Sequence, residues 1–179
     1  MKILDGKILA RNVKEELKKE VATLKEKTGM VPVLKNVIVG DDHGSCAYAN
    51  SQKKVAEYIG IDYALKTLPK DIPQNDFKEV EHLNADKQVN GIMIHKPLPE
   101  HFDYSEVANY VDTAKDLEGI NVANIGRMIL GETKIIPCTP ASVMEHLKST
   151  GIDLRGKEVV VVGHSTIVGK PLSLLLLRQ

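Results

Sequence analysis

The chain of 179 residues has no tryptophan, only two phenylalanines and only two cysteines, Cys46 and Cys138. The two cysteines lie far apart without metal-ligand spacing, so we expect free thiols in a reducing cytoplasm rather than a disulfide or a metal site. Lysine plus arginine equals aspartate plus glutamate at 24 each, so no net field favours nucleic acid or an anionic membrane. No apolar run approaches the roughly 20 residues that span a bilayer, and the N-terminus lacks the apolar segment of a signal peptide. We therefore expect a cytoplasmic globular protein.

Helical and strand patterns alternate along the chain, which indicates an α/β fold. Apolar residues recur every three or four positions over residues 9–24, as on one stripe of a helix, and Gly29 is placed to end that helix. Further helices are expected at about 45–58, around 77–83, at 104–111, at 122–130 and from Thr139, the expected N-cap. Strands are expected at 37–39, 61–68, 91–94 and 157–162.

Two short stretches carry the first candidate site. Pro97 and Pro99 exclude helix and central strand, so residues 95–99 form a stiff loop at a strand end, where ligands bind in open α/β sheets. His95 and Lys96 on this loop are either ligand contacts or proton carriers, or exposed polar residues. On the helix near 45–58, Tyr48 and Gln52 share a face and either meet across a small cleft or are a packed tyrosine and a solvated glutamine.

A second candidate site follows Gly151. The apolar stretch 157–162 is expected as a strand buried on both faces, followed by a turn with Gly163, Ser165 and Gly169 and by an apolar helix. This order is that of a dinucleotide-binding unit, in which glycines let the backbone approach a pyrophosphate at a helix N-terminus. The spacing differs from Gly-x-Gly-x-x-Gly, so a plain strand-to-helix connection stays open.

A short polar turn around Gly119 is the third candidate. Asp116, Glu118 and Asn121 either hold a ring amide or amine of a ligand, or form a solvated run of charge.

Seven strings in collinear order resemble one family over essentially the whole chain. They are Val39-Gly40-Asp41-Asp42, Ser45-x-x-Tyr48, residues 91–99 with Pro97-Leu98-Pro99, Lys115-Asp116-Leu117-x-Gly119, residues 124–127, residues 137–140 and residues 163–171. The chain is identified by them as a member of the bifunctional methylenetetrahydrofolate dehydrogenase/methenyltetrahydrofolate cyclohydrolases.

The resemblance implies a three-layer α/β catalytic, folate-binding domain over residues 1–150. The first βα unit of an incomplete Rossmann-like NAD(P)-binding domain would follow over residues 151–179. It also implies a homodimer of one-carbon metabolism, both oxidoreductase and hydrolase, that uses NADP or NAD and tetrahydrofolate derivatives. Because a single βα unit is not a nucleotide domain, we expect the 179-residue chain alone to lack dehydrogenase activity.

The resemblance also assigns site residues. Tyr48 would stack near the pterin, and the segment Lys96, Pro97, Leu98 and Pro99 would shape its pocket. The residues expected to hold the cofactor are Gly163, His164, Ser165, Ile167 and Gly169.

Three departures lie at the centre of this implied site. Gln52 stands at the position of the family's catalytic lysine, and His95 stands where a glutamine supports that lysine. Glu118 replaces the aspartate that grips the pterin. Since glutamine carries no proton at neutral pH, we predict impaired hydrolysis unless His95 or Lys96 substitutes. His164 replaces an arginine that often binds the 2′-phosphate of NADP, which leaves the choice between NAD and NADP open. A folate-binding relative without turnover is the alternative function.

Overall fold

The computed structural model describes residues 3–132 and 135–179. Met1 and Lys2, the first two residues of the N-terminal stretch in which no signal peptide is expected, lie outside the described residues. The described chain forms two compact units, residues 12–116 and residues 1–11 with 117–179. Helix α1, Gly6–Thr28, begins in the second of these and continues into the first. The elements that follow in residues 12–116 are β1 (Val33–Val39), α2 (His43–Ile59), β2 (Asp62–Leu68), the 3-10 turn η1 (Gln74–Asp76), α3 (Glu79–Ala85), β3 (Gly91–Ile94) and α4 (Tyr104–Ala108).

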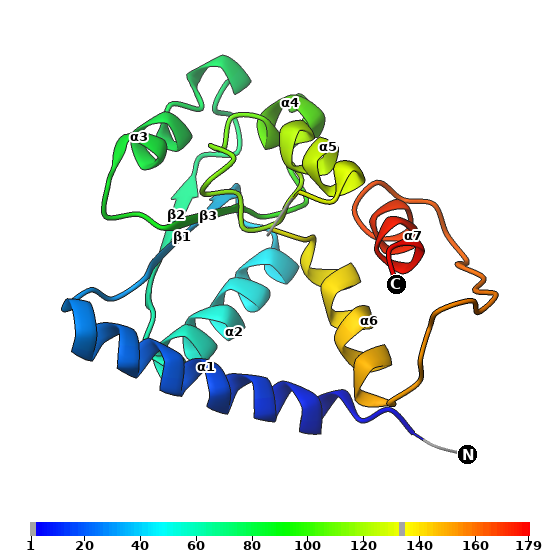
Figure 1. The fold of residues 1–179 in the computed structure, drawn as a ribbon. Helices are drawn as coiled ribbons and strands as arrows, with labels where there is room; N and C mark the ends of the chain where they lie inside the picture. Colours follow the sequence, from blue (N-terminus) through cyan, green and yellow to red (C-terminus); the bar gives the residue numbers. More distant parts are fainter. Residues whose placement is uncertain (1–2, 133–134) are drawn as a thin grey trace. The chain divides into compact units, whose positions relative to one another are not determined.

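A parallel sheet of order β2-β1-β3 organises residues 12–116. Helix α2 lies on one face of this sheet and α3 on the other, which gives the three layers expected (Figure 1). Alternate strand residues face opposite sides, so Val37, Val39, Ile92 and Ile94 meet Val80 and Leu83 of α3, Val107 of α4 and Phe77 and Phe102 in one apolar core. The other face of the sheet, toward α2, carries the polar groups described below.

Turn glycines end two helices where the sequence predicts. Gly60 adopts φ 89° and its N–H bonds the carbonyl of Ala56, which closes α2. Gly29, at φ 70°, follows α1 in the same left-handed conformation, where a side chain would be strained. Helix α1 is confirmed, but its apolar stripe is largely exposed, and Val21 is its only buried residue among those described.

Helices α5 (Val122–Leu130), α6 (Cys138–Ser149) and α7 (Gly169–Leu177) form the second unit around a small apolar core of Met128, Met144 and Leu175. Two sequence predictions are wrong here. Helix α6 starts earlier than expected, with Pro137 rather than Thr139 as its N-cap residue. Residues 157–162 form no strand, and Val160 and Val162 are 87% and 97% exposed, because no neighbouring strand pairs with them in the part of the chain described. In residues 12–116, helix α4 ends at Ala108 and is therefore shorter than the helix predicted at 104–111.

None of the described helices is long and apolar enough to cross a membrane.

Candidate functional site

The start of α2 is fixed to the loop that follows β3. The carboxylate of Asp42 accepts a hydrogen bond from the backbone N–H of Ser45, and this bond is the largest cause of the lowered pKa of Asp42. The buried hydroxyl of Ser45 lies 2.7 Å from the carbonyl oxygen of Lys96 and 2.9 Å from Asp42 Oδ1. Because α2 begins at this anchor, Tyr48 is carried within reach of the loop after β3.

A buried polar cluster lies between the sheet and α2. Its centre is Asn36 in β1, whose side chain is fully buried. Asn36 Nδ2 lies 2.7 Å from Gln52 Oε1, 2.8 Å from the hydroxyl of Tyr63 and 2.8 Å from His95 Nε2. Gln52 Nε2 in turn points to the sulfur of Met93 at 3.1 Å. Gln52 is therefore held inward, and the interpretation of it as a solvated residue is wrong.

His95 belongs to this cluster and is 5% exposed, so the interpretation of it as an exposed polar residue is wrong. Its ring meets the ring of Tyr48 edge-on, with 5.7 Å between centroids and 69° between planes. Burial lowers the pKa of His95, because the apolar surroundings disfavour the charged imidazolium. Burial also raises the pKa of the Tyr63 phenol. At neutral pH the cluster is therefore made of uncharged groups.

The side chain of Lys96 does not join this cluster but lies against Tyr104. It is exposed, and its ammonium lies 3.5 Å from the centroid of the Tyr104 ring on α4, a cation–π contact. The peptide bond from Lys96 to Pro97 is cis. Of the two residues considered as substitutes for a lysine, only His95 therefore contacts Asn36 in the cluster.

A cleft of about 900 Å³ opens at the carboxyl ends of the three strands. It is lined by the loops after β1, β2 and β3, namely residues 39–42, Lys70 and Asp71, and residues 97–101. Tyr48 is not among its lining residues; what joins Tyr48 to the Pro97 loop is its contact with His95. The edge of the sheet is the one at which open α/β folds bind ligands.

The glycine turn before α7 is a separate feature of the second unit. A Cβ on Gly169 would stand 2.1 Å from the carbonyl oxygen of Gly163, so only glycine fits there. Gly163 itself adopts φ 120°. The hydroxyl of Ser165 accepts from the N–H groups of Val168 and Gly169 at 3.2 and 3.4 Å, which caps the helix start. An open hollow of about 360 Å³ adjoins this turn, lined by Gly163, His164, Gly169, Lys170, Ser173 and Leu174; Ile167 lies within the turn.

The polar turn around Gly119 divides into separate parts. Lys115 is structural, since its ammonium donates to the carbonyl oxygens of Leu83, Asn84 and Asp86 at 3.0, 2.7 and 2.7 Å. Asp116 is buried and forms a β-bridge with Ile92, so a solvated run of charge is wrong for it. Asn121 caps α5 through Ala123 N, whereas Glu118 is half-buried.

Sequence reasoning missed two members of the cluster, Asn36 and Tyr63. A signal for Asn36 was present, because an asparagine inside an otherwise apolar strand is buried only with partners. Tyr63 gave no comparable signal, since tyrosine is an ordinary strand residue.

Comparison with known proteins supports the assignment by resemblance. The profile described as "Tetrahydrofolate dehydrogenase/cyclohydrolase, catalytic domain" matches residues 4–118, and that of the corresponding NAD(P)-binding domain matches residues 137–179. The "Bifunctional protein FolD" of Acetivibrio thermocellus is 45% identical over 99% of this chain and 62% of its own length, and that of Bacillus subtilis is 42% identical.

Solved structures agree with these matches. The Campylobacter jejuni bifunctional enzyme FolD superposes with a TM-score of 0.96 at 39% identity, over 99% of this chain and 63% of that one. A Trypanosoma brucei methylenetetrahydrofolate dehydrogenase-cyclohydrolase, solved with NADP cofactor and inhibitor, gives a TM-score of 0.91 at 32% identity, over 97% of this chain and 60% of that one. The chain thus spans about 62% of the length of the curated relatives it matches. On this basis the chain belongs to the tetrahydrofolate dehydrogenase/cyclohydrolase family.

Proposed function

We propose that this chain supplies the folate site and the start of the cofactor site of an enzyme of one-carbon metabolism. The enzyme oxidises methylenetetrahydrofolate to methenyltetrahydrofolate with NADP or NAD, and it hydrolyses the product poorly. In this proposal residues 1–150 form the folate-binding domain and residues 151–179 open the NAD(P)-binding domain. It acts in the cytoplasm as a homodimer. The observation that carries the proposal is the contact of Tyr48 with His95, two residues before Pro97, in a chain of this family.

In the folate site, Tyr48 offers an exposed aromatic face against which a pterin can stack, being 56% exposed. Pro97, Leu98 and Pro99 form the wall at the strand ends, and Glu118 is assigned to the amide and amine of the pterin by resemblance. Oxidation needs the methylene carbon aligned, and no protein base has to remove a proton from it. The uncharged cluster under Tyr48 is compatible with that step.

The glycine turn fits a dinucleotide. Gly169 packs against the Gly163 carbonyl where a Cβ would intrude, so glycine allows the tight turn, and the hollow beside this turn at the start of α7 is where a pyrophosphate would lie. Gly163, Ser165, Ile167 and Gly169 would hold this group, with His164 near the adenosine side. The cofactor, when bound, accepts the hydride that leaves the folate.

Hydrolysis is the step expected to suffer. It needs an activated water and a group that relocates protons, for which a lysine of lowered pKa is suited. Gln52 lacks this chemistry, its carbonyl oxygen accepts from Asn36, and Lys96 lies against Tyr104. Only His95 is left as a titratable group of the cluster near neutral pH.

Both half-reactions should be assayed in a protein that carries this chain with the remaining residues of the NAD(P)-binding domain. We expect NAD(P)-dependent oxidation, weak hydrolysis, and a gain in hydrolysis for Gln52→Lys, larger when it is combined with His95→Gln. Strong hydrolysis in the unchanged protein, unaffected by His95→Ala and Lys96→Ala, would contradict the proposal.

The alternative is a relative that binds folate without turnover, which the engaged Gln52 amide favours. Binding of a folate with no NAD(P)-dependent change in absorbance would select this alternative.

A further inference from the structure

Asn36 occupies an unusual position for a polar residue. It lies in the central strand of the sheet, paired with Leu65 of β2 and Met93 of β3, and its side chain is fully buried. A buried amide without partners costs several kcal/mol of folding free energy by order of magnitude. The amide nitrogen of Asn36 does have partners at this place, and its contacts restrict which hydrogens the neighbouring groups can carry toward it.

The hydrogen count around Asn36 Nδ2 fixes the state of His95. The amide nitrogen has two hydrogens, and it lies within 2.8 Å of Gln52 Oε1, Tyr63 Oη and His95 Nε2. This nitrogen has no lone pair to offer, so none of the three atoms can direct a hydrogen toward it, and its two hydrogens are shared among the three as acceptors. A proton on Nε2 would set N–H against N–H, so the imidazole is neutral and carries its proton on Nδ1.

The opposite orientation of the Asn36 amide is less favourable. As placed, the one buried side-chain atom without a partner in the described residues is Asn36 Oδ1. Turning the amide by 180° would leave an NH₂ group unpartnered there and would set Oδ1 against Gln52 Oε1. Unpaired buried N–H groups are rarer than under-satisfied carbonyl oxygens, so the placement with Nδ2 at the centre is preferred.

We propose that Asn36 is a positioning residue that holds His95 as the neutral Nδ1–H tautomer and holds the Gln52 carbonyl beside it. Nε2, the nitrogen that faces Asn36, is then withheld as a base. The remaining polar atom of the ring is a donor, suited to a carbonyl oxygen or ring nitrogen of a bound molecule. This catalytic consequence rests on the proposed function, whereas the tautomer itself does not.

The tautomer can be measured directly in the 179-residue chain. Long-range ¹H–¹⁵N spectra separate protonated from unprotonated ring nitrogens, and the His95 signals are those missing in His95→Gln. We expect an unprotonated Nε2 at pH 7. Asn36→Asp places an acceptor at the same site, so it should move the proton to Nε2 and raise the His95 pKa by about one unit or more, as an adjacent carboxylate does. Asn36→Val removes the donor and should leave a mixture of both tautomers.

Ser45→Ala is the matched control. It removes a buried hydroxyl that contacts the same loop through Lys96 O, but it does not touch the His95 ring. It should lower stability without changing the tautomer. An Nε2–H tautomer in the unchanged chain, or an unaltered tautomer in Asn36→Val, would overturn the proposal; should Asn36→Asp fail to fold, Asn36→Val still decides. Because no turnover is measured, failure here is distinguishable from failure of the proposed function.

Discussion

Lys115 belongs to the family string Lys115-Asp116-Leu117, and its contacts predict that it stabilises the fold rather than takes part in catalysis. Its ammonium donates to three carbonyl oxygens at the end of α3, and the bonds to Leu83 and Asn84 are partly buried. Lys115→Met keeps the length of the side chain and removes all three bonds. A hydrogen bond to a charged group contributes about 1.5–3 kcal/mol, and the three bonds share one ammonium, so we expect a loss of roughly 2–4 kcal/mol in unfolding free energy.

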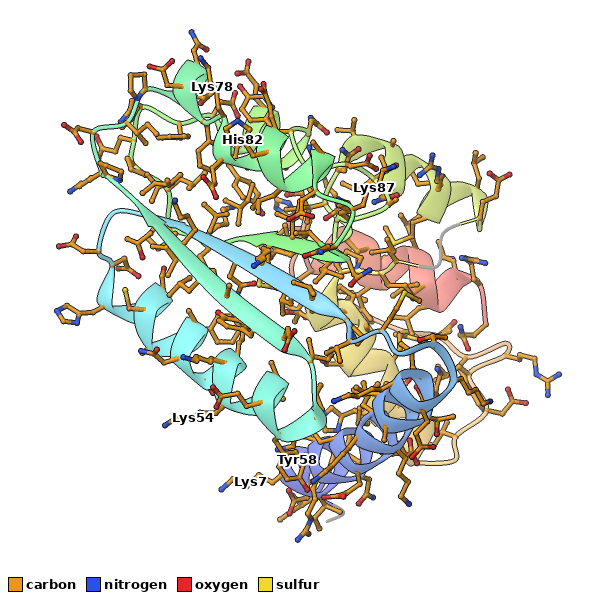
Figure 2. All side chains as sticks on the ribbon, turned by 90° about the vertical axis from the view of Figure 1, so that its left-hand side faces the viewer. Lys7, Lys54, Tyr58, Lys78, His82 and Lys87 are labelled. Atoms are coloured by element: carbon orange, nitrogen blue, oxygen red, sulfur yellow. The ribbon has the colours of Figure 1, made fainter. Side chains whose placement is uncertain are left out.

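Urea denaturation at pH 7 measures this loss. Lys87→Met is the matched control, because Lys87 is an exposed lysine in the turn after α3 (Figure 2) and should change stability by less than about 0.5 kcal/mol. Lys115→Arg should recover part of the stability, since it keeps the charge. A loss for Lys115→Met no larger than that of the control would refute the structural role.

Two further predictions concern the candidate sites. Burial lowers the folded-state pKa of His95, so the contribution of the neutral ring to the free energy of unfolding is fully present above the unfolded pKa of about 6.5. As the pH falls below that value, this contribution decreases by up to about 1.4 kcal/mol per pH unit. Between pH 7.5 and 5 the urea midpoint should therefore fall less steeply in His95→Gln than in the unchanged chain, and equal slopes would contradict this. Gly169→Ala places a Cβ 2.1 Å from the Gly163 carbonyl oxygen and should lower the free energy of unfolding by about 1–3 kcal/mol. Gly126→Ala in α5 has open space around the new Cβ and should cause no loss of stability. Thermal unfolding compares the two variants, and an unchanged stability of Gly169→Ala would mean that the turn is looser than described.

Local signals predicted most of the fold around the sheet. Gly60 ends α2 and Gly29 follows α1 because each can take a left-handed conformation, which is a property of the residue itself. The apolar stretch 157–162 misled for the opposite reason. A strand is stabilised by its neighbours, and no partner lies beside it among the described residues.

The site was only partly predictable from the sequence. The Pro97 loop could be placed because proline restricts the backbone by itself. The state of His95 could not, because it depends on Asn36, which is distant in sequence and becomes a neighbour only when β1 and β3 pair. For Gln52 the sequence left both a small cleft and solvent open, since a helix pattern does not show what the facing strand offers.

Strand β1 serves two purposes with neighbouring residues. Val37 points into the apolar core with α3 and α4, and Asn36, one position earlier, points to the polar cluster under α2. A mutation on the polar side can therefore alter proton placement while leaving the hydrocarbon packing across the sheet intact. The protons of the polar cluster and the packing of the apolar core are thus governed by different residues of the same strand.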